Sequence, residues 1–92
     1  MIKNFKDKNT EEFFGGKAVK QFSGFKKAAE RKLTMLDNAN ELRDLLAPPA
    51  NRLEKLKGDR AGQHSIRIND QWRICFTWKP DGLYEVEITD YH

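Results

Sequence analysis

The spacing of the apolar residues changes halfway along the chain, and this change limits the folds that the chain can adopt. In the first half, apolar residues recur at intervals of four, four and three residues, at Phe25, Ala29, Leu33 and Leu36. This spacing places them on one face of a helix, so the sequence predicts an amphipathic helix from Ser23 to about Asn38. The change comes at Pro48 and Pro49, which lack amide donors and disfavour a helical residue before them.

After residue 50 the apolar residues alternate with polar ones, as is typical of half-buried β-strands. The three clearest runs contain Ile66 and Ile68, then Trp72, Ile74, Phe76 and Trp78, then Val86 and Ile88. Turns are predicted at residues 69–71 and 79–82, the second with a glycine for a positive φ. A further strand is expected at residues 52–56, followed by a turn at residues 57–60.

Weaker signals predict shorter elements in the first half of the chain. Residues 2–5 are compatible with an opening strand, and Asn9 with its neighbours resembles the start of a helix that ends at the two glycines at residues 15–16. Asn40 is a candidate cap for a short helix that reaches Leu46. We therefore expect an α+β fold, in which two N-terminal helices pack on an antiparallel sheet of three to five strands.

Length and composition indicate one water-soluble domain over residues 1–92. The 92 residues allow one two-layer core, and 17 Lys and Arg against 14 Asp and Glu give a net charge of +3. Cys75 is the only cysteine, so no internal disulfide can form. The first residues lack the apolar segment of a secretion signal, and no stretch is apolar enough to span a bilayer. We expect a cytoplasmic protein without membrane attachment.

The alternation in the strands also predicts a cationic face on the sheet. If the apolar residues face the helices, Arg67 and Arg73 point to the opposite face, on neighbouring strands. Lys57 and Arg60 can reach the same face, which gives a groove suited to a phosphodiester backbone. The alternative is that these cations pair with acidic neighbours such as Glu87, as surface charges commonly do.

Candidate proton carriers accompany these cations. They are Glu54, Asp90, Tyr91 and His92. RNA carries its own nucleophile, the 2′-hydroxyl group, so a protein that moves two protons and stabilises the pentacovalent phosphate with Lys or Arg can cleave RNA without a metal. The pattern also fits a frayed chain end at His92 and a packed aromatic side chain at Tyr91.

Other chemistries find little support in the sequence. His64 and His92 are the only histidines, and neither C-x-x-C nor H-E-x-x-H occurs, so we expect no metal site and no cofactor. Cys75 has the parity of the exposed or groove side, where we expect a small unreactive side chain. Trp72 and Trp78 share the apolar parity, which favours a place in the core.

The second half of the chain closely resembles HigB-type toxins of the RelE/ParE superfamily. The resemblance is carried by Leu56-Lys57-Gly58-Asp59-Arg60-x-Gly62, Ser65-Ile66-Arg67-Ile68-Asn69, Trp72-Arg73-Ile74-Cys75-Phe76 and Val86-Glu87-Ile88-Thr89-Asp90-Tyr91-His92. The helical half is similar in length and order, so the resemblance spans essentially the whole chain. It implies the RelE-like, microbial-ribonuclease type of fold.

The resemblance also implies a function and partners. Such a protein would be the toxin of a bacterial type II toxin–antitoxin system, a ribosome-dependent endoribonuclease that enters the ribosomal A site and cuts translated mRNA. Its partner would be a HigA-type helix-turn-helix antitoxin, through which alone it would reach operator DNA. The family roles fall on Lys57 and Arg73 as phosphate-stabilising cations, and on Asp90, Tyr91 and His92 as a C-terminal catalytic cluster.

One position departs from the family pattern. Many active relatives carry a histidine three residues before the motif lysine, where this chain has Glu54. Glu54 is a candidate general base, or its presence means slower chemistry. Two other functions therefore stay open: a poison of gyrase or of the ribosome that binds without cutting, and a subunit that acts mainly as co-repressor with its antitoxin.

Overall fold

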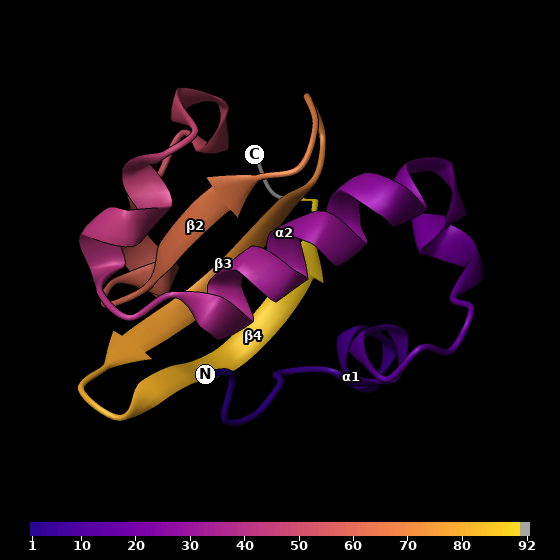
Figure 1. Ribbon diagram of the computed structural model, residues 1–92, viewed down its shortest axis with the longest axis horizontal. Helices are drawn as coiled ribbons and strands as arrows, with labels where there is room; N and C mark the ends of the chain where they lie inside the picture. Colours follow the sequence, from indigo (N-terminus) through magenta and orange to yellow (C-terminus); the bar gives the residue numbers. More distant parts are fainter. Residues whose placement is uncertain (91–92) are drawn as a thin grey trace.

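Short helices precede a four-stranded sheet in the computed structural model, which describes residues 1–90 (Figure 1). The α-helices are α1 (Lys8–Phe14) and α2 (Lys26–Asn38), and the 3₁₀ helices are η1 (Lys20–Phe25), η2 (Leu42–Leu46), η3 (Pro49–Asn51) and η4 (Gly58–Arg60). The strands are β1 (Glu54–Lys55), β2 (His64–Arg67), β3 (Arg73–Lys79) and β4 (Gly82–Thr89). The predicted α+β class is confirmed.

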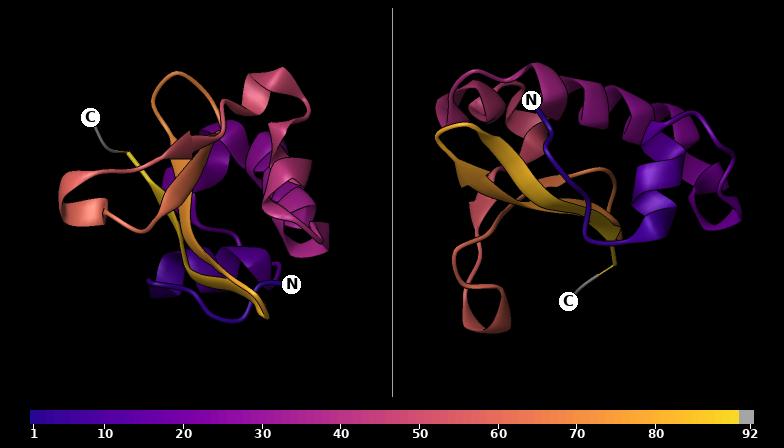
Figure 2. Two further views of the ribbon diagram at one scale, coloured as in Figure 1. Left: turned by 90° about the vertical axis from the view of Figure 1, so that its left-hand side faces the viewer. Right: turned by 90° about the horizontal axis from the view of Figure 1, so that it is seen from below.

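The sheet is an antiparallel meander with the strand order β1-β2-β3-β4. Its register places Ile66 opposite Ile74, and Ile74 opposite Ile88. These three side chains are buried on the face that α2 covers, which Figure 2 shows from two sides. The helix contributes Leu33 and Leu36, which are essentially inaccessible to water. Burial of such side chains stabilises the fold by about 1.5–3 kcal/mol each.

The N-terminal segment lies along the free edge of β4. It forms two isolated parallel bridges, from Ile2 to Leu83 and from Phe5 to Val86, in place of the predicted strand. Between them, the side chain of Asn4 accepts a hydrogen bond from the backbone of Glu85, which has a positive φ of 55°. A bulge in the neighbouring β3–β4 register accompanies this kink and interrupts regular strand pairing.

Helix boundaries differ from the prediction where local hydrogen bonds decide them. Asp7, and not Asn9, caps α1, because its carboxylate accepts from the backbone amide of Thr10. Glu41 takes the place predicted for Asn40 and forms a reciprocal capping box with Asp44 in η2.

The predicted helix from Ser23 to Asn38 is divided at Phe25. This residue has a φ of −139°, so the preceding turns form the separate helix η1 and α2 begins at Lys26. The change of direction lets the rings of Phe22 and Phe25 both contact Trp72. Trp72 and Trp78 pack against the core as predicted.

The first strand is shorter than predicted because Arg52 adopts the left-handed conformation, with a φ of 46°. Only Glu54 and Lys55 then pair with β2. Within residues 1–90, no helix has the length and apolar character needed to cross a membrane.

Candidate active site on the outer face of the sheet

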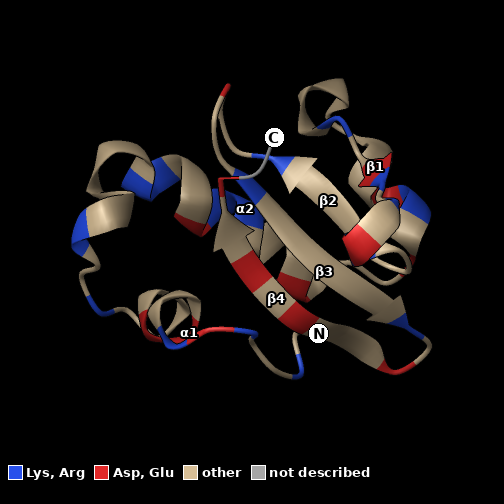
Figure 3. Cartoon of the chain, turned by 180° about the vertical axis from the view of Figure 1, so that it is seen from behind, with Lys and Arg blue, Asp and Glu red and all other residues tan. Residues whose placement is uncertain are grey.

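The face of the sheet opposite α2, here called the outer face, carries the two arginines that the strand parity predicts. Arg67 on β2 pairs directly with Arg73 on β3. Figure 3 looks onto this face, with basic positions at the adjoining ends of β2 and β3 and acidic positions along β4. The predicted location of both arginines on one face is confirmed.

Fixed hydrogen bonds hold the guanidinium group of Arg73. Its Nε donates to Oγ of Ser65 over 2.8 Å, and one terminal nitrogen donates to the carbonyl oxygen of Arg52 over 2.7 Å. The same nitrogen lies 3.9 Å from the carboxylate of Glu54. The Arg73 side chain is only 15% exposed, so the group is oriented before any ligand arrives.

A cleft of about 350 Å³ opens beside this guanidinium group. Its lining residues come from the β1 region, the end of β2, the β2–β3 turn and the start of β3: Arg52, Glu54, Arg67, Asn69, Asp70, Gln71 and Arg73. Three arginines against two carboxylates leave the lining with a net charge of +1. One of these carboxylates, Asp70, pairs with Arg67 and is almost fully exposed.

Lys57 lines a second concavity, which adjoins the first through Glu54. This concavity measures about 550 Å³ and also includes Lys55, Leu56 and Arg60. Lys57 is exposed and makes no ion pair with a described residue. Because Glu54 lines both concavities, it stands between the cleft of Arg73 and the region of Lys57.

Arg60 reaches the outer face but is paired there. Its guanidinium group donates to Glu87 on β4 over 3.1 Å and to Gln63 over 3.2 Å. Lys6 adds a second cation 3.9 Å from the same Glu87 carboxylate. For Arg60, the alternative raised from the sequence, pairing with an acidic neighbour, is therefore the one observed.

The end of β4 is tied to the rim of the cleft through Asp90. The side-chain amide of Gln71, in the β2–β3 turn, donates to the Asp90 carboxylate over 2.8 Å. This contact brings the last described residue to the turn that lines the cleft. The predicted site residues Tyr91 and His92 lie outside the described residues.

Cys75 lies on the outer face but is not exposed, contrary to the sequence-based prediction. It sits between Ser65 and Glu87 in the strand register and is fully buried. Burial raises the pKa of its thiol to about 11, so at neutral pH the thiol is protonated and is not a nucleophile.

His64 belongs to the other side of the sheet and not to the cleft. Its ring stacks on Phe76, with the ring centres 6.2 Å apart. Burial and the nearby Lys55 lower the pKa of His64, so the ring is neutral at physiological pH. Among residues 1–90, no three His, Cys, Asp or Glu side chains are grouped so as to hold a metal ion.

Several residues of this site were not predicted from the sequence, among them Arg52, Ser65 and Gln71. Arg52 acts through its backbone carbonyl, which no side-chain pattern identifies. Ser65 shares the parity of Arg67 and Arg73, a signal that was available. The contribution of Gln71 depends on the geometry of the turn, which the alternation of apolar residues does not specify.

Comparison with known proteins identifies the family. The model of the RelE-like toxin of the type II toxin–antitoxin system HigB matches residues 3–92. Toxin HigB-1 of Vibrio cholerae is 41% identical over 80 residues, which cover 85% of this chain and 84% of that protein. Endoribonuclease HigB of Proteus vulgaris is 36% identical over 61 residues, which cover 66% of this chain and 65% of that protein.

Solved structures confirm the RelE-like fold. A chain of the YoeB–YefM complex from Staphylococcus aureus superimposes with a TM-score of 0.62 at 22% identity, covering 100% of this chain and 98% of that chain. The YoeB dimer from the same organism gives a TM-score of 0.57 at 23% identity, covering 99% and 94%. From the family match and the Vibrio relative, the chain belongs to the HigB family of RelE-like toxins of type II toxin–antitoxin systems.

Proposed function

We propose that this toxin is a ribosome-dependent endoribonuclease that cuts mRNA in the ribosomal A site. The observation that supports this most directly is the guanidinium group of Arg73, held in a fixed orientation at the wall of a cationic cleft. A preoriented arginine is suited to the charge that develops on a phosphate during transfer. The Proteus relative bears the name endoribonuclease, which fits this chemistry.

In the proposed reaction, RNA supplies the nucleophile. A base takes the proton of the 2′-hydroxyl group, whose oxygen forms a bond to the adjacent phosphorus atom. The bond from phosphorus to the 5′-oxygen breaks, and an acid protonates that oxygen. The products are a 2′,3′-cyclic phosphate and a free 5′-hydroxyl group, with no further reactant.

We assign the charge-stabilising roles to Arg73 and Lys57, which adjoin Glu54 from two sides. Glu54 is a candidate base, since it is exposed at the junction of the two concavities and its carboxylate lies 3.9 Å from the Arg73 guanidinium group. Asp90, Tyr91 and His92 are proposed as the C-terminal catalytic cluster. The hydrogen bond from Gln71 holds Asp90 at the rim of the cleft, which supports the role proposed for Asp90.

Arg60 and Arg67 are proposed to bind the RNA backbone without taking part in bond breaking. Both are paired in the free protein, Arg67 with Asp70 and Arg60 with Glu87. A phosphate must compete with these carboxylates, so each arginine contributes less affinity than an unpaired cation would.

We further propose a HigA-type helix-turn-helix antitoxin as the partner, and contact with operator DNA only through it. The family description names a toxin–antitoxin system, and a structural relative forms a heterotetrameric toxin–antitoxin complex with YefM. Cytoplasmic action follows from the proposed ribosomal substrate.

Mapping of transcript ends tests the proposed activity. Wild type, Arg73→Ala and Arg43→Ala are induced briefly in translating cells, Arg43 being an exposed arginine on η2 that pairs with Glu41. New 5′ ends inside coding regions are expected with wild type and with Arg43→Ala, and not with Arg73→Ala. Growth arrest with intact transcripts would instead identify a poison that acts by binding, either of the ribosome or of gyrase. Intact transcripts without growth arrest would favour the co-repressor.

A further inference from the structure

A third concavity, which is also basic, lies beside the cleft on the other side of Asn69. It measures about 730 Å³ and is lined by residues at the junction of η1 and α2 together with the β2–β3 turn: Ser23, Gly24, Phe25, Lys26, Lys27, Ala28, Arg31 and Asn69. Asn69 also lines the cleft that contains Arg73. The two concavities therefore meet at one side chain of the turn.

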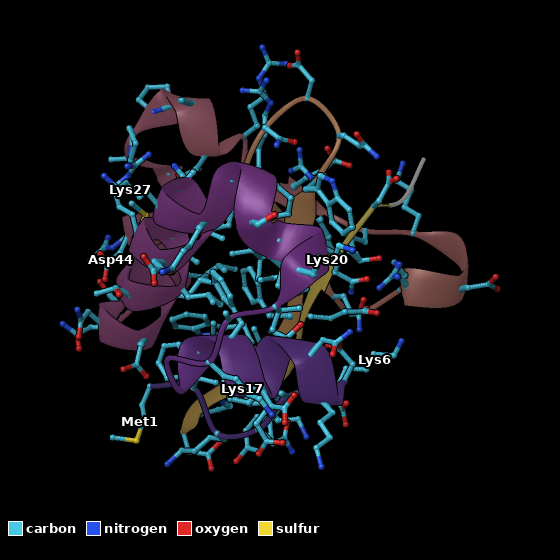
Figure 4. The ribbon with its side chains drawn as sticks, turned by 90° about the vertical axis from the view of Figure 1, so that its right-hand side faces the viewer. Met1, Lys6, Lys17, Lys20, Lys27 and Asp44 are labelled. Atoms are coloured by element: carbon cyan, nitrogen blue, oxygen red, sulfur yellow. The ribbon has the colours of Figure 1, made fainter. Side chains whose placement is uncertain are left out.

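The charge of this third concavity is uniformly positive. Lys26, Lys27 and Arg31 are all exposed, and no acidic residue lines it. None of the three forms an ion pair with a residue in the described part of the chain. Figure 4 shows Lys27 well apart from Lys6 and Lys17. The charges of those two lysines therefore lie on other parts of the surface. A polyanion can bind here without displacing an existing partner.

An aromatic ring and an amide complete the surface. Phe25 is half-buried, and its ring packs on Trp72 with the ring centres 5.2 Å apart. The Oδ1 atom of Asn69 accepts hydrogen bonds from the backbone amides of Gln71 and Trp72. This leaves the amide nitrogen of Asn69 as its donor. Proteins that bind single-stranded nucleic acid combine cations along the phosphate backbone with aromatic side chains on which bases stack. This concavity offers both, together with a neutral hydrogen-bond donor.

From these observations we infer that the concavity around Phe25, Lys27 and Arg31 binds the same RNA strand that occupies the cleft, several nucleotides from the scissile phosphate. The inference rests on the proposed function and extends it, because it gives the strand a path across Asn69. The surface contributes affinity through phosphate contacts and base stacking, and it takes no part in bond breaking. It therefore makes binding depend on the length of the RNA.

The test compares two RNA lengths by equilibrium binding. The probes are a trinucleotide and a ten-nucleotide single strand, each with 2′-deoxyribose at the position where cleavage would occur. The test variant is the double substitution Lys27→Ala/Arg31→Ala. Its control, Lys3→Ala/Lys8→Ala, removes the same charge from two exposed lysines that line none of the concavities described above.

Wild type and control are expected to bind the ten-nucleotide strand more tightly than the trinucleotide. The test variant should lose about 25-fold in affinity for the longer strand at 0.1 M salt, and its salt slope should fall by about 1.4, since each lost phosphate contact removes about 0.7 on a single strand. Its affinity for the trinucleotide should equal that of wild type.

Equal binding of the ten-nucleotide strand by wild type and the test variant would overturn the inference, as would the same loss in the control. Loss of affinity for ribosomes alone, with oligonucleotide binding unchanged, would assign the surface to ribosomal RNA and would also overturn it. The proposed activity is judged separately: if Arg73→Ala abolishes cleavage while the test variant binds as wild type, the nuclease stands and the strand path is wrong.

Discussion

At the scale of single residues, the proposed phosphate binding on the outer face depends on the fixed orientation of the Arg73 guanidinium group. Its contacts with Ser65 and with the carbonyl oxygen of Arg52 fix the plane of the guanidinium group, which then presents its remaining N–H groups to the cleft. Lysine has the same charge but lacks the planar fork, so it cannot make both contacts and still direct a donor at a phosphate.

Arg73→Lys is therefore expected to be nearly as inactive as Arg73→Ala. Both should reduce the rate of mRNA cleavage on programmed ribosomes by about 10²–10³-fold, the usual effect of removing one donor that stabilises a transition state. Far-ultraviolet circular dichroism checks that the variants fold. A lysine variant that retained half of the wild-type rate would show that charge alone is sufficient and that the fixed geometry is not needed.

The buried thiol of Cys75 gives a prediction about pH. The pKa is raised to about 11 in the folded protein from an ordinary value of 9.0, so the unfolded chain ionises first as the pH increases. The protonated thiol therefore stabilises the folded protein by about 2–3 kcal/mol relative to the ionised one. This stabilisation is fully present below pH 9 and is lost as the pH rises to 11.

The measurement is urea unfolding of wild type and Cys75→Ala between pH 7 and pH 11. The difference in unfolding free energy, wild type minus variant, should be constant up to pH 9 and then decrease. Other titrating groups are common to both proteins and cancel. A difference that stays flat to pH 11 would mean that the thiol ionises as easily in the folded protein as in the unfolded chain.

At the scale of secondary-structure elements, a buried polar contact joins α2 to η3. The ammonium group of Lys32 donates to the side-chain oxygen of Asn51, and both residues are buried. The amide of Asn51 also donates to the carbonyl groups of Leu45 and Ala47. Burial and the charges of Arg31 and Arg67 lower the pKa of Lys32. Asn51 directly precedes Arg52, whose carbonyl holds Arg73.

Asn51→Ala should destabilise the protein by about 3 kcal/mol, because it leaves the Lys32 ammonium group and the buried carbonyl group of Leu45 without their partner. Asn38→Ala, at the exposed end of α2, is the matched control and should change stability by less than about 0.5 kcal/mol. Both values come from urea unfolding at pH 7. Similar stability for the two variants would show that Asn51 does not hold η3 against the helix.

The elements also show what the sequence could predict. Alternation located β3 and placed Arg67 and Arg73 on the outer face, because side-chain parity follows directly from strand geometry. It could not predict the break at Phe25 or the left-handed Arg52, since both depend on contacts with distant residues. It also missed the burial of Cys75, because parity identifies a face but not what covers it.

At the scale of the whole molecule, α2 and its flanking helices cover one face of the sheet (Figure 2), and the opposite face carries the arginine pair of β2 and β3. The arginines of the cleft come from β2, from β3 and from the segment before β1, so the site exists only in the folded meander. Residues 52–73 supply the lining of the cleft. The family motifs in that range therefore predicted much of the site. The geometry of the β2–β3 turn had to come from the structure.

The central claim is that this cleft promotes attack of the RNA's own 2′-hydroxyl group on the neighbouring phosphate. The most direct test uses ribosomes programmed with an mRNA that carries one 2′-deoxyribose on the 5′ side of the mapped cleavage position, with an all-ribose mRNA as control. We predict cleavage of the all-ribose mRNA to a 2′,3′-cyclic phosphate end and no cleavage of the substituted one. Equal cleavage of both mRNAs at that position would contradict the mechanism.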